Sequence, residues 1–243
     1  MAKKKFLKKQ LSISAFFPCF NDAGSIGLIV EDAYETLRKV CSDFEVIVVD
    51  DYSKDESKII LRRLKKKYKS LRLILHKENV GYGGALKSGF KAAKKEYVFY
   101  TDGDGQYDAK ELLLLTSRIS HKADIIQGYK IKRFDPWYRL ILGRLYHYLS
   151  KLLFGLKIRD VDCDFRLIRK SALKTLNLEY NSGVICVELV KKLQDKGYKF
   201  REVGVHHYPR FHGHSQFFNY KRIIKTLFEL SQLWLKLVIL KYE

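Results

Sequence analysis

Two aspartates separated by one glycine follow an apolar run of the sequence, and this spacing is able to hold a divalent cation. Asp102 and Asp104 lie in the segment YTDGDGQ at 100–106. On an extended chain, side chains two residues apart point to the same side, about 7 Å apart. Carboxylate oxygens suit Mg²⁺ or Mn²⁺, which commonly bind through one or two carboxylates together with the phosphates of a substrate. A Gly-Asp turn that holds no ligand is the structural alternative.

A second acidic pair, Asp50 and Asp51, ends the apolar run EVIVV at 45–49. Ligands of open α/β sheets bind outside the carboxyl ends of the strands. Carboxylates at that place accept hydrogen bonds from a ribose hydroxyl or from a base N–H. Ser53 and Asp55 are better placed than this pair to cap the following helix. The pair therefore favours a nucleotide pocket.

A glycine-rich segment, NVGYGGALKS at 79–88, is the third candidate. Gly81, Lys87 and Ser88 fit part of the phosphate-loop pattern G-x-x-x-x-G-K-[ST], but Leu86 stands at its second glycine. The dinucleotide pattern G-x-G-x-x-G fails at the same position. The segment therefore predicts a glycine turn that opens a helix, and neither of the two nucleotide loops.

Apolar runs alternate with helical patterns from residue 11 to about 130, which predicts βαβ units and a mainly parallel sheet flanked by helices. In this part we expect strands at Ser12–Phe17, Glu45–Asp50, Arg72–His76, Tyr97–Thr101 and Asp124–Gly128. The helices expected between and after them are Ser25–Cys41, Asp55–Tyr68, Gly83–Lys95 and Ala109–Ser120. The downstream elements expected are a helix at Trp137–Phe154, a strand at Phe165–Ile168, a helix at Val184–Lys196, a strand at Phe200–Tyr208 and a terminal helix from Phe217. No linker-like stretch separates the two parts, so we expect one continuous domain.

Taken together, these segments resemble family 2 glycosyltransferases with the GT-A fold. The resemblance rests on FPCFND at 17–22, VVDDYS at 48–53, Asn79-x-Gly81 and DGDGQ at 102–106. The segments DVDCDFRL at 160–167 and RFHGHS at 210–215 are most similar to those of dolichol-phosphate mannose synthases and polyprenyl-phosphate glycosyltransferases. The resemblance implies an α/β GT-A catalytic domain over residues 11–215, with a nucleotide-sugar-binding half (11–130) and an acceptor half (131–215). A basic tail (1–10) would precede it, and an amphipathic C-terminal helix (216–243) would follow it.

The same resemblance implies roles for individual residues. Asp102, Asp104 and Gln106 would hold the metal, Mg²⁺ or Mn²⁺, and Arg210 would close over the diphosphate of the donor. The residues implied in nucleotide-sugar binding are Pro18, Phe20, Asp22, Asp50, Asp51, Asn79, Gly81, Lys87, Asp102, Gly103 and Ser215. The residues implied in catalysis are Asp104, Asp162, Asp164, Arg166 and Arg210.

The implied reaction is the inverting transfer of a hexose from a nucleotide-diphosphate sugar, GDP-mannose or a UDP-hexose. A polyprenyl or dolichyl phosphate acceptor is already ionised, so cations would position it; the candidates are Arg133, Arg139, Arg159 and Arg166. A glycan or glycolipid hydroxyl, as in surface polysaccharide synthesis, would need a carboxylate base; the candidates are Asp162, Asp164 and Glu188. Asp164 and Gln216 stand where the lipid-phosphate group commonly has a small and a basic residue, so both acceptors stay open.

Composition narrows the kinds of partner. Lys and Arg number 47 against 27 Asp and Glu, a net charge of +20, in a chain of 243 residues that is 47% apolar. This composition excludes a disordered basic tail and predicts phosphorylated ligands, an anionic membrane surface or nucleic acid. We find no helix-turn-helix, RRM or KH pattern, so we expect no nucleic acid partner.

Two stretches predict contact with a membrane surface. Residues 137–154 and the terminal helix interleave basic residues with aromatic and aliphatic ones, as interfacial helices do. Packing against the core, or against a second copy in a homo-oligomer, is the alternative. The start lacks a signal-peptide pattern, and the four cysteines lack disulfide or zinc spacing, so we expect a cytoplasmic protein that is peripheral at the inner face of the membrane. A catalytically inactive membrane scaffold is a further alternative, against which the intact Asp102 and Asp104 argue.

Overall fold

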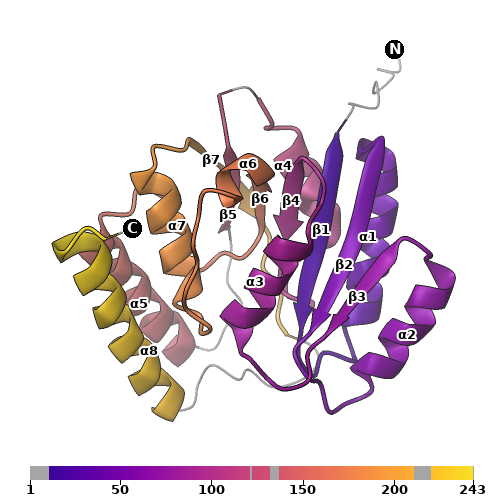
Figure 1. The fold of residues 1–243 in the computed structure, drawn as a ribbon, viewed down its shortest axis with the longest axis horizontal. Helices are drawn as coiled ribbons and strands as arrows, with labels where there is room; N and C mark the ends of the chain where they lie inside the picture. Colours follow the sequence, from indigo (N-terminus) through magenta and orange to yellow (C-terminus); the bar gives the residue numbers. More distant parts are fainter. Residues whose placement is uncertain (1–10, 121, 132–136, 211–219, 243) are drawn as a thin grey trace.

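The computed structural model describes residues 11–120, 122–131, 137–210 and 220–242, which form one sheet with helices on both of its faces (Figure 1). The strands are β1 (Ser12–Cys19), β2 (Asp43–Asp50), β3 (Leu71–Leu75), β4 (Tyr97–Tyr100), β5 (Ile125–Lys130), β6 (Arg166–Arg169) and β7 (Phe200–Val205). Their order across the sheet is β3-β2-β1-β4-β6-β5-β7. All neighbours pair in parallel except β6, which runs antiparallel to both β4 and β5. The predicted α/β class with a mainly parallel sheet is confirmed.

The helices follow the expected order. They are α1 (Ile26–Val40), α2 (Ser57–Lys67), α3 (Tyr82–Ala92), α4 (Leu112–Thr116), α5 (Trp137–Phe154), α6 (Lys170–Leu173), α7 (Ile185–Asp195) and α8 (Tyr220–Trp234), with a 3₁₀ turn at Ala109–Glu111 and a π turn at Leu235–Ile239. The short α6 was not predicted. The helix expected at Ala109–Ser120 is instead a 3₁₀ turn followed by the five-residue α4. The hydroxyls of Thr116 and Ser117 donate to the carbonyls of Leu113 and Leu114 at its end, which competes with continuation of the helix.

Two apolar cores lie on opposite faces of the sheet. Ile13, Ala15 and Phe17 of β1 face the core shared with α1, α2 and α4. Phe16 faces the other core, which is shared with α3, α6 and α7. Since successive side chains of a strand point to opposite faces, a strand that is buried on both sides must be apolar throughout. This explains why the strands appear in the sequence as continuous apolar runs.

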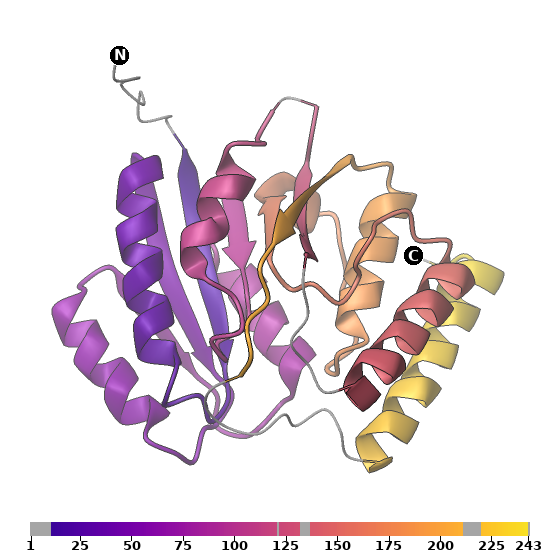
Figure 2. The same ribbon diagram turned by 180° about the vertical axis from the view of Figure 1, so that it is seen from behind.

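The helices α5 and α8 lie side by side at the end of the molecule farthest from β3 (Figures 1 and 2). A third core joins them to α7 and includes Phe154, Val187, Leu230 and Leu233. The indole nitrogen of Trp234 donates to the carbonyl of Leu153, 3.0 Å away. The described part of the terminal helix therefore packs on the rest of the protein. Its predicted start at Phe217 lies outside the described residues, as do the basic tail 1–10 and the boundary at residue 215.

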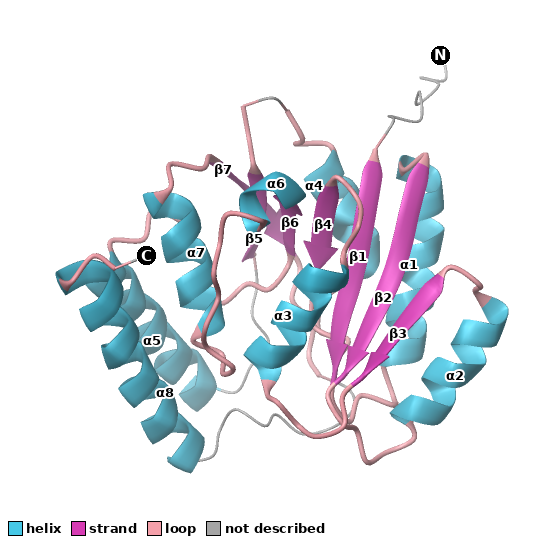
Figure 3. Ribbon diagram, viewed as in Figure 1, coloured by secondary structure: helices cyan, strands magenta, loops and turns pink. Residues whose placement is uncertain are grey.

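The strands β1 to β4 end at the same edge of the sheet, the lower edge in Figure 3. Cys19 pairs with Asp50, and Asp50 pairs with Leu75. The loops that follow these strands are therefore neighbours in space. They are the three candidate segments of the sequence together with the loop after β1.

Gly103 lies against the end of β1, where a methyl group in place of its hydrogen would come within 2.5 Å of the Pro18 carbonyl oxygen. Gly103→Ala should therefore lower the free energy of unfolding by about 1–3 kcal/mol, measured by urea denaturation. The matched control is Gly27→Ala in α1, where the nearest atom outside the helix backbone is 3.5 Å away. This control should leave stability unchanged or raise it by up to about 1 kcal/mol. Equal effects of the two substitutions would contradict the assigned contact.

Candidate active site

Hydrogen bonds join the loop after β1 to the loop after β2 and to the first residue of α2. The backbone N–H of Asn21 donates to the Ser53 hydroxyl at 2.9 Å, and that of Asp22 donates to the Ser57 hydroxyl at 3.1 Å. In return, the Asn21 side-chain oxygen accepts from the Lys54 N–H at 2.7 Å. Asn21 has a φ of 58°, a left-handed conformation that asparagine tolerates better than most residues. These bonds fix the backbone of the loop at Asn21 and Asp22.

Asp22 is a perturbed carboxyl group. Burial raises its pKa to about 6, and the charge of Asp104 adds to the increase. A hydrogen bond from the Phe20 N–H at 3.0 Å and the charge of Arg210 act in the opposite direction. Asp22 therefore lies close enough to Asp104 and Arg210 to be affected by both charges.

The acidic pair after β2 divides into two roles. The Asp51 carboxylate accepts from the N–H groups of Val80 and Gly81, both at 2.9 Å, and contacts the His76 Nδ1 at 2.7 Å. It thereby holds the glycine turn in place. Asp50 is fully buried; its Oδ2 accepts from the Ser53 N–H at 3.3 Å, and its Oδ1 has no hydrogen-bond partner among the described residues.

The glycine turn packs against the segment before α7. Gly81 has a φ of 90°, and a methyl group there would lie 2.6 Å from the Asn181 carbonyl oxygen. The Asn79 side chain donates to the Asp51 carbonyl oxygen at 3.1 Å. The Lys87 ammonium donates to the Glu179 carbonyl oxygen at 2.9 Å, so the described contacts do not bring it to the aspartates after β4.

Asp102 and Asp104 follow β4 and are held by different partners. The Asp102 Oδ1 accepts from the Tyr82 hydroxyl at 2.7 Å. The Asp104 Oδ1 accepts from the Gln106 N–H at 3.0 Å, and its Oδ2 accepts from the Arg210 guanidinium. Asp104 and Arg210 are 106 residues apart in the sequence, and the structure brings them together.

The electrostatic environment suits a cation. Burial raises the pKa of Asp102 well above its usual range, and the charges of Asp164 and then Asp104 raise it further. A divalent cation would relieve this repulsion, because its charge favours ionised carboxylates. The Gln106 side chain donates to the Tyr208 carbonyl oxygen at 3.2 Å, which ties the aspartate loop to the segment that carries Arg210.

Beneath the aspartates lies a buried polar network. Arg166 is 1% exposed and donates to Gln127 at 2.6 Å, to Asp164 at 2.8 Å, to the Tyr100 hydroxyl and to the Val161 carbonyl. Because Arg166 is buried in this way, an acceptor molecule cannot contact it directly. Its guanidinium instead holds the Asp164 carboxylate in place. Glu188 is also fully buried, where it accepts from two backbone N–H groups and from the Lys192 ammonium.

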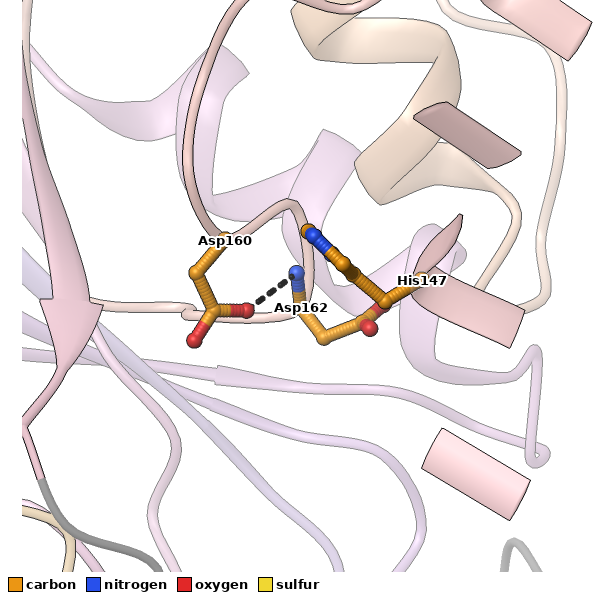
Figure 4. A group of neighbouring side chains, drawn as sticks. All are labelled: His147, Asp160 and Asp162. Atoms are coloured by element: carbon orange, nitrogen blue, oxygen red, sulfur yellow. Dashed lines mark hydrogen bonds between the residues drawn. The ribbon is translucent and has the colours of Figure 1, made fainter. Parts of the chain in front are cut away.

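A group that the sequence did not predict contains His147, Asp160 and Asp162 (Figure 4), and their ligand atoms lie within 4.8 Å of one another. The Asp160 carboxylate accepts from the N–H groups of Asp162 and Lys130, at 3.1 and 3.3 Å. The Lys130 ammonium lies 3.8 Å from the same carboxylate. A positive charge is therefore already present beside this group.

Several predicted positions bear on the acceptor half. Arg133 and Ser215 lie outside the described residues, as does the side chain of Arg139. Arg159 lies 3.9 Å from Glu202 at the surface.

No described helix has the length and apolar character needed to cross a bilayer.

The fold and the paired aspartates after β4 define a class, the glycosyltransferases with the GT-A fold. Glucosyl-3-phosphoglycerate synthase from Mycobacterium tuberculosis, in complex with Mn²⁺ and UDP-glucose, has this fold: the TM-score is 0.69 at 16% identity, over 92% of this chain and 80% of that one. The model of glycosyl transferase family 2 matches residues 14–176 of this chain. The chain belongs to glycosyl transferase family 2, which confirms the predicted family.

Two curated relatives carry polyprenyl phosphates in their names. Dodecaprenyl-phosphate galacturonate synthase of Rhizobium johnstonii is 26% identical over 212 residues, 86% of this chain and 62% of that protein. Undecaprenyl-phosphate 4-deoxy-4-formamido-L-arabinose transferase of Edwardsiella ictaluri is 24% identical over 219 residues, 90% of this chain and 66% of that protein. The chain thus spans less than two thirds of the length of these relatives.

The raised pKa of Asp22 predicts a pH dependence of stability. In the folded protein the Asp22 carboxyl group keeps its proton up to a pH of about 6, whereas in the unfolded chain it loses that proton near pH 3.8. The free energy of unfolding of the wild type should therefore fall, relative to Asp22→Asn, as the pH rises from about 4 to 6, by at most about 3 kcal/mol. Urea denaturation at a series of pH values measures this difference. Parallel profiles for the two proteins would contradict the raised pKa.

Proposed function

We propose that the protein catalyses the inverting transfer of a hexose from a nucleotide-diphosphate sugar, GDP-mannose or a UDP-hexose, to a polyprenyl or dolichyl phosphate at the cytosolic face of a membrane. The observation that carries this proposal is the position of Asp104 beside Asp102 and Arg210 at the carboxyl end of β4. The polyprenyl-phosphate relatives support the acceptor.

The donor would lie along the loops after β1 to β4. Asp102, Asp104 and Gln106 would hold Mg²⁺ or Mn²⁺, and the cation when bound would neutralise the charge of the leaving diphosphate. The paired carboxylates fit such an ion, because the Asp102 Oδ2 has no hydrogen bond among the described residues. Arg210 would exchange its bond to Asp104 for one to the diphosphate.

The remaining donor contacts are proposed from the same arrangement. The base and ribose would contact Pro18, Phe20 and Asp22 together with Asp50 or Asp51. Asn79, Gly81 and Gly103 would contact the sugar nucleotide. The two glycines would do so through their backbone, because the Asn181 and Pro18 carbonyl oxygens occupy the space that a side chain at these positions would fill. Lys87 and Ser215 are proposed as further contacts to the donor.

The acceptor determines whether a base is needed. An ionised phosphate oxygen can attack the anomeric carbon directly: a bond forms there, the bond to the diphosphate breaks, and a nucleoside diphosphate leaves with inversion. Cations beside the acceptor would position it, and Arg166 would act indirectly by fixing Asp164. In the alternative, a glycan hydroxyl acceptor would give its proton to Asp162 or Asp164.

The exposed faces of α5 and α8 support a membrane contact. Leu145, Tyr148 and Leu152 of α5 are 64–82% exposed, and Ile224 and Phe228 of α8 are 61–64% exposed. The segment 137–154 contains no acidic residue, and 220–234 contains one. An apolar face flanked by positive charge complements a bilayer with anionic lipids. We therefore propose a peripheral location at the inner face of the membrane.

Asp104→Asn keeps the shape of the side chain and removes its charge. Transfer to a short polyprenyl phosphate should fall by roughly 100-fold or more, since one electrostatic contact to a leaving group contributes that much. Binding of UDP or GDP should also lose its dependence on Mn²⁺, measured by calorimetry. The control is Asp108→Asn, four residues away, where asparagine caps the following turn as well as aspartate does. Unchanged turnover in Asp104→Asn would contradict the site, and wild-type transfer to a glycan alone would favour the hydroxyl acceptor.

Leu145→Ser together with Leu152→Ser tests the membrane face. Wild-type protein should co-sediment with phosphatidylglycerol vesicles, and the double variant should bind about tenfold or more weakly, because each leucine would lose roughly 1 kcal/mol of burial. The control pair is Leu28→Ser and Ile59→Ser, which are 65% and 59% exposed on α1 and α2. Undiminished vesicle binding, or a dimer that only the α5 substitutions dissociate, would show that this face has another role.

A further inference from the structure

We propose that Tyr82 is a positioning residue that fixes Asp102 for cation binding. The inference rests on the proposed function, since it assumes that Asp102 and Asp104 bind the cation. Tyr82 is the first residue of α3, and its hydroxyl donates to the Asp102 Oδ1 at 2.7 Å. The two residues are 20 positions apart and come from different loops of the site.

The backbone around Tyr82 is fixed on both sides. The N–H groups of Val80 and Gly81, which precede it, donate to the Asp51 carboxylate. The N–H of Gly83, which follows it, donates to the Asn181 carbonyl oxygen at 2.8 Å. Because Asp51 directly follows β2 and Asn181 lies in the segment before α7, the turn cannot shift without breaking contacts to both. The phenol ring is therefore presented to Asp102 in one direction.

The Tyr82 hydroxyl gives Asp102 a hydrogen bond without a positive charge, which a cationic side chain would not do. Asp102 is close to Asp104 and Asp164, so its carboxylate is repelled by its neighbours. A neutral hydrogen bond to Oδ1 orients the group while adding no positive charge that would compete with a metal ion. Asp104 differs, since its partner Arg210 must leave before a cation is bound through the same oxygen. In this arrangement Asp102 is oriented before the cation binds, whereas the Asp104 oxygen becomes available only after Arg210 has moved away.

Two other features of the structure give weaker support for a ligand site. The basic hollow at the opposite edge of the sheet is lined by Lys94, Lys170 and Lys174. Exposed lysines are expected at many places on a chain of net charge +20, and no further contact there indicates a ligand. In the group formed by His147, Asp160 and Asp162, the Lys130 ammonium already lies 3.8 Å from the Asp160 carboxylate.

Tyr82→Phe removes one oxygen atom and keeps the ring. The affinity of the protein for Mn²⁺, followed by electron paramagnetic resonance of the free ion in the presence of UDP or GDP, should fall about tenfold, as expected for one hydrogen bond to a charged group. Nucleotide binding in the presence of EDTA should stay close to that of the wild type. The melting temperature should fall by only a few degrees, because one buried hydrogen bond is a small part of the stability of a chain of this size. A merely structural role would lower the melting temperature and the metal-free nucleotide binding with no separate loss of Mn²⁺ affinity. The control is Tyr198→Phe, whose hydroxyl contacts Thr175 at the surface.

A second measurement does not require the Tyr82→Phe variant. 3-Fluorotyrosine inserted at position 82 should shift its fluorine resonance when Mg²⁺ is added, because its hydrogen-bond acceptor becomes a metal ligand. Wild-type Mn²⁺ affinity in Tyr82→Phe, or an unmoved fluorine resonance under saturating Mg²⁺, would overturn this inference alone. If the wild-type protein itself binds no Mn²⁺ with nucleotide, the proposed cation site fails and the inference fails with it.

Discussion

The repulsion among carboxylates gathered at one edge of the sheet is the constraint on which the rest of the site depends. The four are Asp22, Asp102, Asp104 and Asp164. Burial and mutual charge raise the pKa of Asp102 and of Asp22, so these groups disfavour ionisation when they are alone. Arg166 supplies positive charge from within the core, and Arg210 supplies it from the segment after β7. Under the proposed function, a cation bound by Asp102 and Asp104 would reduce this repulsion.

The sequence predicts the parts of this arrangement that are local. Each strand and the acid pair after it are neighbours in the chain, so apolar runs and strand-end carboxylates are sufficient to place Asp50, Asp51, Asp102 and Asp104 at one edge. Alternation of strands and helices also predicts a parallel sheet. It does not reveal that β6, an antiparallel strand, enters the sheet between β4 and β5, because that order depends on packing of distant segments.

The contacts that assign roles within the site depend on packing and were not predictable. Arg166 reaches Tyr100 across 66 residues, and only its burial separates a core arginine from one that binds an acceptor. The sequence predicts Asp51 as a donor contact, but it does not predict that the Asp51 carboxylate accepts hydrogen bonds from two backbone N–H groups of the glycine turn. Tyr82 has no signal beyond its place at a helix start. The general rule is that residue type predicts chemistry, whereas the partner decides whether a side chain binds a ligand or another residue.

The central claim is that a divalent cation and a nucleotide meet at Asp102 and Asp104. Crystals grown with Mn²⁺ and UDP or GDP, with diffraction recorded at a wavelength where manganese scatters anomalously, would locate the ion directly. We predict one strong anomalous peak within about 2.0–2.4 Å of both carboxylates, with Arg210 moved from Asp104 to the diphosphate. Bound nucleotide with no peak there, or a peak only at the group formed by His147, Asp160 and Asp162, would contradict the account.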